Sequence, residues 1–138
     1  MLRPPLVIAL ESDLGGGKTT FVKGLARGLG VGSNVTSPTF TIKRQYKGSG
    51  HIKLYHYDFY RLNEPGIMAE ELREALADHR AIIVMEWPRQ VSGLLPKNHL
   101  RIQLERIANQ PDRRRISLRY PETLRSIVGR LGAGGGNE

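Results

Sequence analysis

Two short runs of consecutive apolar residues stand out along this chain, Leu6–Leu10 and Ala81–Met85. Each run is rich in Leu, Ile or Val and is too short to be the core of a typical helix, which is characteristic of a strand buried on both faces. Strands of this kind lie inside a parallel sheet that carries helices on both sides. The sequence therefore predicts two central parallel strands, the second of which ends at Glu86.

Other segments alternate between apolar and polar residues, which predicts strands with two different faces. Thr39–Tyr46 and Ile52–Tyr60 are separated by a glycine-containing turn, so we expect a hairpin. In its second arm the alternation places two sets of side chains on opposite faces, Leu54, His56, Asp58 and Tyr60 on one and Tyr55, Tyr57 and Phe59 on the other. Two further strands are predicted at Leu100–Leu104 and Arg115–Arg119, joined by a connection over residues 107–114.

Helical spacing of apolar residues predicts three helices. The first carries Phe21, Val22, Leu25 and Leu29 and is ended by Gly28, Gly30 and Gly32. The second covers Ile67–Asp78, and the third covers Glu122–Leu131. Residues 132–138 are glycine-rich and are expected to be disordered. We find no internal linker, so residues 1–131 are interpreted as a single domain.

The first apolar run leads into a glycine-rich segment that ends in lysine and threonine and is followed by the first helix. This segment matches the P-loop (Walker A) pattern G-x-x-x-x-G-K-[ST] at Gly17, Lys18 and Thr19, with Ser12 in place of the first glycine. In a P-loop, backbone amides at a helix N-terminus wrap the phosphates, the lysine reaches the β- and γ-phosphates, and the hydroxyl binds Mg²⁺. The predicted ATP-binding residues are Asp13, Leu14, Gly15, Gly16, Gly17, Lys18, Thr19 and Thr20. The alternative is a glycine-rich turn that carries a lysine by chance.

A segment rich in hydroxyl groups follows the first helix, with Thr36, Ser37 and Thr39 around Pro38. Proline biases the preceding residue away from helix, so the segment is a turn into the next strand or a nucleotide-sensing loop. Hydroxyl groups beside a γ-phosphate and its metal order such loops in P-loop switches. The neighbouring P-loop favours the second interpretation.

Two carboxylates lie in or at the end of predicted strands. Asp58 is surrounded by large rings, where a carboxylate is costly without a cation, a metal or a hydrogen-bond donor. Its alternative is an edge-strand aspartate that is exposed or paired with Arg61. Glu86 ends an apolar strand, as does the acid that holds Mg²⁺ or orients water in P-loop ATPases. Its alternative is a strand-end glutamate in solvent.

Composition narrows the class of protein. The 138 residues include no cysteine, which excludes disulfides and thiolate chemistry and agrees with a cytoplasmic location. No apolar run approaches the length of a membrane span, so no membrane association is expected. The net charge of +8 favours an anionic partner or a solvated basic surface about equally. Arg113, Arg114 and Arg115 are expected at a solvated hairpin tip.

Four segments in order resemble the TsaE (YjeE) family of P-loop ATPases: the P-loop, Val35–Thr41, Tyr55–Leu62 and Glu86–Pro88. The resemblance implies an α/β, P-loop NTPase-like three-layer fold, with a mixed parallel/antiparallel sheet flanked by helices. It also implies a Mg-dependent ATPase that serves the synthesis of N6-threonylcarbamoyladenosine (t6A) in tRNA. The implied cofactors are ATP and Mg²⁺. The implied partners are the TsaD and TsaB proteins, through which tRNA is contacted indirectly.

The same resemblance assigns roles to single residues. Lys18, Asp58 and Glu86 are implied to be catalytic, Thr19 and Glu86 to hold the metal, and Trp87 to be an active-site or partner-contacting aromatic residue. Family members usually begin with a further strand and helix, which this chain is expected to lack.

Two other classes remain as alternatives. A P-loop small-molecule kinase would need an acceptor pocket and a lid, and a non-enzymatic nucleotide- or RNA-binding module would fit Ser12 and the basic charge. A GTPase is not favoured, because the sequence contains no Asn-Lys-x-Asp segment to bind guanine.

Overall fold

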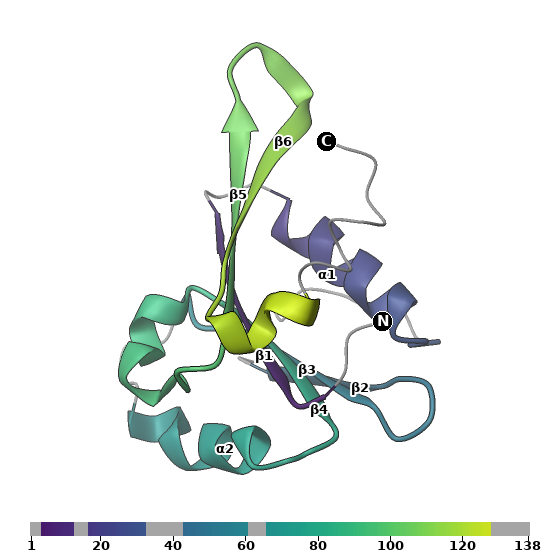
Figure 1. Ribbon diagram of the computed structural model, residues 1–138, viewed down its shortest axis with the longest axis vertical. Coiled ribbons are helices and arrows are strands. Elements are labelled where there is room, and N and C mark those ends of the chain that lie inside the picture. Colours follow the sequence, from purple (N-terminus) through teal and green to yellow (C-terminus); the bar gives the residue numbers. More distant parts are fainter. Residues whose placement is uncertain (1–3, 13–16, 33–42, 61–65, 128–138) are drawn as a thin grey trace.

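The computed structural model describes residues 4–12, 17–32, 43–60 and 66–127 of the chain (Figure 1). In these residues six strands form one sheet in the order β2-β3-β4-β1-β5-β6. The strands are β1 (Leu6–Ser12), β2 (Lys43–Lys47), β3 (Lys53–Asp58), β4 (Ala81–Glu86), β5 (Leu100–Ile107) and β6 (Gln110–Arg119). β3, β4, β1 and β5 are parallel, whereas β2 pairs with β3 and β6 pairs with β5 in antiparallel fashion. The predicted mixed sheet is confirmed.

The two continuous apolar runs form β1 and β4, which are neighbours in the sheet. The first five residues of β1 and all six residues of β4 are buried. Burial on both faces explains why neither strand alternates in sequence, since both of its faces are covered by other elements.

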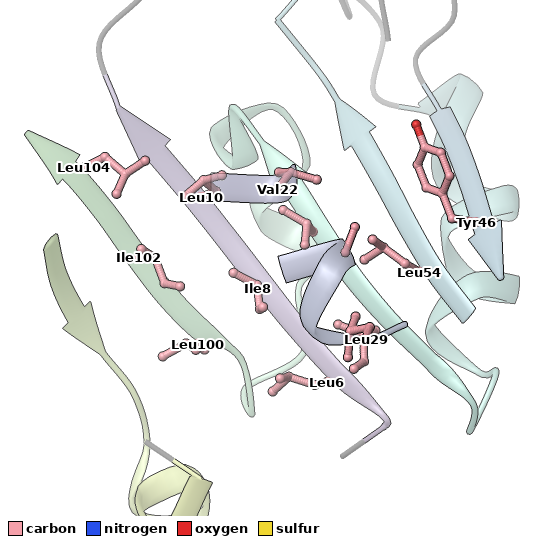
Figure 2. Packing of buried hydrophobic residues seen from close by; sticks show 13 residues of the cluster. Leu6, Ile8, Leu10, Val22, Leu29, Tyr46, Leu54, Leu100, Ile102 and Leu104 are labelled. Carbon is pink, nitrogen blue, oxygen red and sulfur yellow. The ribbon is translucent and has the colours of Figure 1, made fainter. Parts of the chain in front are cut away.

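One face of the sheet is covered by α1 (Lys18–Gly28). Val22, Ala26 and Leu29 pack against Leu6, Ile8 and Leu10 of β1 and their neighbours on β4, β5 and β3, and Figure 2 shows these side chains converging under the helix. Val22 is completely buried. The helix that begins at the predicted phosphate loop is thus anchored on the strand that leads into that loop.

The opposite face is covered by α2 (Gly66–Leu76) and by η1 (Pro88–Leu94), a 3₁₀ segment with a kink at Val91. Met68, Leu72 and Ala75 of α2 pack with Val91 against aromatic and aliphatic side chains of β3, β4 and β1. Two helical layers therefore enclose the sheet, as predicted (Figure 1). No helix among the described residues has the length and apolar character that crossing a membrane requires.

The alternation predicted for the second hairpin arm is also confirmed. Leu54 joins the cluster beneath α1, whereas Tyr55, Tyr57 and Phe59 join the cluster beneath α2. β3 lies between β2 and β4, so it is not an edge strand. The edge-strand position in the alternative for Asp58 is therefore wrong, and the pairing with Arg61 lies outside the described residues.

Several predicted boundaries differ from the structure. β5 and β6 are longer than expected and continue to a tight turn at Asn109, which has a left-handed φ of 63°. Arg113, Arg114 and Arg115 therefore lie within β6 and not at a hairpin tip. Pro111 has no N–H to donate to a neighbouring strand, so the sequence indicated a loop at this position. β6 is an edge strand, where the missing N–H is tolerated.

Other boundaries fall at the ends of described segments. The predicted strand Thr39–Tyr46 is described only from Lys43, as β2. The predicted last helix begins as a 3₁₀ turn, η2 (Glu122–Leu124), and continues helically to residue 127, with the rest outside the described residues. The segment after Trp87 forms η1, which the sequence did not indicate because it has no helical period.

The far end of α1 is held against the β2–β3 turn. The Ser49 N–H donates to the Leu29 carbonyl over 2.8 Å, and a Cβ on Gly48 would lie 2.5 Å from the same carbonyl oxygen. This approach of two backbone segments requires glycine at position 48.

We therefore predict that Gly48→Ala destabilises the fold by about 1–3 kcal/mol, because the clash is with backbone and not with a flexible side chain. The matched control is Gly24→Ala on α1, where a Cβ meets nothing within 4 Å. That control should gain roughly 0.5–1 kcal/mol from helix propensity. Urea unfolding measures both, and equal stability of the two variants would contradict the proposed close approach.

Candidate functional site

The carboxyl ends of β1, β3 and β4 meet at one edge of the sheet, next to the start of α1. The register pairs Glu86 of β4 with Asp58 of β3 on one side and with Leu10 of β1 on the other. The main-chain N–H of Phe59 donates to the Glu86 carbonyl over 3.1 Å, so β3 and β4 remain paired past their acidic residues. This edge brings together Ser12, Lys18, Asp58, Glu86 and Trp87.

Lys18 is the first residue of α1 and is only 9% exposed. Its Nζ lies 3.4 Å from Ser12 Oγ and 4.8 Å from the centroid of the Trp87 ring. Gly17 before it has a φ of 100°, a left-handed conformation that favours glycine. Ser12, which departs from the P-loop pattern, thus supplies an oxygen to the lysine of that pattern.

Glu86 is buried, with 3% of its surface exposed, and lies beside the completely buried His56. His56 Nε2 and Glu86 Oε2 are 2.5 Å apart, which makes a hydrogen bond in which the imidazole N–H donates to the carboxylate. The alternative of a strand-end glutamate in solvent is therefore wrong. Alternation along the strand places His56 on the face of Asp58, but no motif in the sequence marks it as a site residue. The available indication of such a role was that an imidazole on a buried strand face needs a polar partner.

Asp58 is partly buried and accepts a hydrogen bond from the Tyr60 N–H over 3.0 Å. Burial is the main cause that raises the pKa of its carboxyl group, and the neighbouring charge of Glu86 raises it further. The Tyr60 N–H, His56 and Lys18 act in the opposite direction and lower the pKa. Asp58 is thus electrostatically coupled to the other charged groups of this edge.

Trp87 directly follows Glu86 and adopts a left-handed conformation with φ 59° and ψ 54°. Such a conformation is uncommon for a large side chain and is strained unless its surroundings maintain it. The turn carries the indole ring over Lys18, and the ring also contacts Tyr60, with centroids 4.9 Å apart. Trp87 therefore lies beside the lysine of the predicted P-loop.

The remaining predicted residues are only partly described. Thr19 is partly buried in the first turn of α1, next to Lys18, and Thr20 is exposed. Asp13, Leu14, Gly15 and Gly16, and also Thr36, Ser37 and Thr39, lie outside the described residues. The described part of the site consequently consists of Lys18, its contacts Ser12 and Trp87, and the two acids Asp58 and Glu86.

A magnesium ion would find suitable donors here, because it prefers oxygen ligands and usually keeps waters and phosphate oxygens in its shell. The Thr19 hydroxyl and the Glu86 carboxylate are such donors. The described residues contain no group of three or more His, Asp or Glu side chains arranged to hold a metal ion. A site completed by phosphate oxygens does not need such a group.

A cavity of about 270 Å³ opens beside Ser12 and Trp87. Its other walls come from β1, β5 and the start of η1: Glu11, Pro88, Arg89, Gln103, Leu104 and Glu105. The cavity gives the site an open side toward β5, where part of a ligand could lie.

We predict that Asp58→Asn stabilises the folded protein at neutral pH. Because burial raises the Asp58 pKa above its usual 3.8, the folded state holds the proton more tightly than the unfolded chain, and stability falls as pH rises through this interval. The variant should therefore melt higher than the wild type at about pH 7, and the difference should vanish at about pH 3.5. Asp112→Asn, at an exposed position on β6, is the control. A difference in melting temperature that is independent of pH would contradict this account.

Comparison with known proteins identifies the family. The family model "Threonylcarbamoyl adenosine biosynthesis protein TsaE" matches residues 1–116. A Bacillus subtilis protein named tRNA threonylcarbamoyladenosine biosynthesis protein TsaE is 40% identical over 116 residues, which cover 83% of this chain and 70% of that protein. The Treponema pallidum protein of the same name is 37% identical over 109 residues, covering 79% of each chain. The chain spans 63% of the Haemophilus influenzae relative, at 35% identity.

A solved structure agrees with these matches. The crystal structure of YdiB from Bacillus subtilis superimposes with a TM-score of 0.73 at 32% identity, covering 96% of this chain and 80% of that one. The mixed sheet with flanking helices is therefore shared with a solved structure. The matching family model and the identity to the curated relatives together show that this chain belongs to the TsaE family.

Proposed function

We propose that this protein binds ATP with Mg²⁺ and hydrolyses it, and that this activity serves t6A biosynthesis in tRNA. The biosynthetic role is supported by the family model and by the names of the curated relatives. The observation that carries the ATPase proposal is the position of Lys18, at the start of α1 and beside two carboxylates at the ends of β3 and β4. A cytoplasmic location is part of the proposal and agrees with the absence of cysteine.

Each residue has a distinct task in this proposal. Lys18 offsets negative charge on the β- and γ-phosphate oxygens, and the N–H groups of the first turn of α1 point toward the same phosphates. Thr19 and Glu86 hold the metal directly or through water, and Asp58 supports the metal or the attacking water. Bound Mg²⁺ would neutralise charge that develops on the phosphates and help to orient the water.

The same proposal includes the TsaD and TsaB proteins as partners. The P-loop motif supplies one cation, Lys18. Arg89, which lies two residues after Trp87, is exposed. Phosphoryl transfer depends mainly on positioning and charge stabilisation. A site to which the described residues bring no arginine other than exposed Arg89 in the cavity wall should therefore be slow by itself. We propose that the partners supply the missing contribution and order the loop that contains Thr36, Ser37 and Thr39.

We predict that Lys18→Ala weakens ATP binding by roughly 10- to 100-fold, the equivalent of a charge-assisted hydrogen bond. Titration with a fluorescent ATP analogue, with and without Mg²⁺, measures the affinity. Lys23→Ala is the control, because Lys23 is exposed on another face of α1. A folded Lys18→Ala protein with wild-type affinity and turnover would refute the P-loop assignment.

For Glu86→Gln, which keeps the shape and removes the charge, we expect hydrolysis to fall at least ~10²-fold while ATP still binds. Release of inorganic phosphate at saturating Mg-ATP, with partners present, is the measurement. Glu74→Gln on the exposed surface of α2 serves as the control. Wild-type turnover of Glu86→Gln would transfer the proposed role to Asp58.

The partnership is tested by titrating the purified chain with the TsaD–TsaB heterodimer and following steady-state ATP hydrolysis. We expect slow basal turnover that rises as the complex forms, because contributions in trans can reach ~10³-fold or more in phosphoryl transfer. GTP in place of ATP tests base preference in the same assay. Fast turnover of the chain alone, or a flat rate despite complex formation, would contradict the proposal.

A further inference from the structure

The outer half of the sheet has a face that no helix of the described residues covers. Cross-strand pairs place Arg101 opposite Arg119, Gln103 opposite Ser117 and Glu105 opposite Arg115. These side chains point away from α1, because the alternate pair of Ile102 and Leu118 belongs to the cluster beneath that helix. Figure 1 shows the β5–β6 hairpin extending beyond both helical layers.

This face is strongly basic. Over both of their faces the two strands carry six arginines and two carboxylates, a net charge of +4 out of the chain's +8. The register places Arg101, Arg115 and Arg119 on this face together with Glu105. Alternation along β6 places Arg115 and Arg119 on the same face, and Arg113 precedes them where the β5–β6 register shifts; all three are exposed. Arg101 is held near Glu11, with its Nη1 3.8 Å from Glu11 Oε1. We call Arg101, Arg113, Arg115 and Arg119 the arginine face.

We propose that the arginine face binds the phosphate backbone of RNA. Guanidinium groups bind phosphate oxygens in a forked, two-contact geometry, and side chains two residues apart on a strand form a row that can follow a backbone. Gln103 and Ser117 add neutral donors between the arginines. The neutral donors Gln103 and Ser117, which lie between the arginine pairs, suit the phosphate and sugar oxygens of a nucleic-acid backbone, so RNA is favoured over an acidic protein.

The test compares two triple variants that lose the same charge. Arg113→Gln/Arg115→Gln/Arg119→Gln removes the arginine face, and Lys23→Gln/Arg27→Gln/Arg44→Gln removes three exposed cations elsewhere. Binding of a labelled tRNA transcript, and of poly-glutamate as a non-nucleic polyanion, is followed by fluorescence anisotropy over a salt series. The arginine-face variant should lower the salt slope for tRNA by roughly 2–3, the loss of three phosphate contacts. The control variant should leave the slope near the wild-type value.

Three outcomes would overturn this inference. They are equal losses in both variants, poly-glutamate binding as strong and as sensitive to the arginine-face variant, and no tRNA binding by the wild type at low salt. Basal ATP hydrolysis should be the same in both variants, because none of these residues has a proposed role beside Lys18, Asp58 and Glu86. The result is therefore independent of the proposed ATPase function.

A separate observation concerns His56. Its ring is completely buried, its Nε2 lies 2.5 Å from Glu86 Oε2, and its Nδ1 has no hydrogen-bond partner in the part of the chain that the structure describes. The two residues lie on adjacent parallel strands, with His56 paired in register with Val84. The hydrogen bond thus fixes one oxygen of Glu86 and leaves Oε1 for other contacts.

We infer that His56 is a positioning residue that orients the Glu86 carboxylate, an inference that rests on the proposed ATPase function. A carboxylate held at one oxygen presents the other in a defined direction to a metal or its water. Partners of this kind, behind a metal ligand, typically change affinity or activity by about 10- to 100-fold when they are removed. His56 does not need to touch ATP to have this effect.

The distinguishing variants are His56→Gln and His56→Asn. The Gln amide nitrogen occupies a position close to Nε2 and can still donate to Glu86, whereas the Asn amide nitrogen lies near Nδ1 and does not reach it. We expect His56→Asn to lower kcat by about 10- to 100-fold with little change in KM, and His56→Gln to recover most of this loss. Melting temperatures of both variants exclude a difference in folding as the cause.

If the two variants have equal kcat values in a protein that hydrolyses ATP, the positioning role is refuted and the proposed function is not. The same applies to a loss that appears in KM and melting temperature but not in kcat. A wild-type protein that hydrolyses no ATP even with partners present would instead refute the proposed function, and this inference with it.

Discussion

The structure depends on the burial of titratable groups at one edge of its sheet. Lys18, His56 and Glu86 are each less than a tenth exposed, and Asp58 beside them is partly buried. Charges removed from water are costly unless they are paired with one another or with hydrogen-bond partners. Here pairing depends on strand order, because β3, β4 and β1 must be neighbours with their carboxyl ends aligned. The apolar clusters on both faces hold the strands in that order.

Burial also lowers the stability of the fold where a buried polar atom has no hydrogen-bond partner. His56 Nδ1 and Tyr57 Oη are buried without a hydrogen-bond partner in the described residues. Burial raises the pKa of the Tyr57 hydroxyl, so it remains neutral. An unsatisfied buried polar atom costs about 1–3 kcal/mol, which a core must offset elsewhere. The completely buried side chains of Leu54, Leu72 and Val84, among others, provide the opposing apolar burial.

Much of this architecture is predictable from local sequence, because single-residue patterns report burial directly. The unbroken apolar runs gave β1 and β4, and alternation gave the two faces of β3. The contact between His56 and Glu86 was not predictable, since it joins residues thirty positions apart through a register that no local pattern encodes. The placement of Trp87 over Lys18 depends on a left-handed turn that an aromatic residue rarely adopts. The extent of β6 was missed because Pro111 indicates a loop unless the strand is known to lie at an edge.

Ser12 illustrates how a departure from a motif becomes intelligible in three dimensions. At 3.4 Å, its contact with Lys18 Nζ is longer than a typical hydrogen bond to an ammonium group and is correspondingly weak. The second contact of Lys18, with the Trp87 ring, is a cation–π interaction worth about 1–2 kcal/mol when partly desolvated. Phosphate oxygens carry full charge and form stronger, shorter bonds to an ammonium group than either of these two contacts. The contacts with Ser12 and Trp87 are therefore weak enough to be exchanged for contacts with an anion.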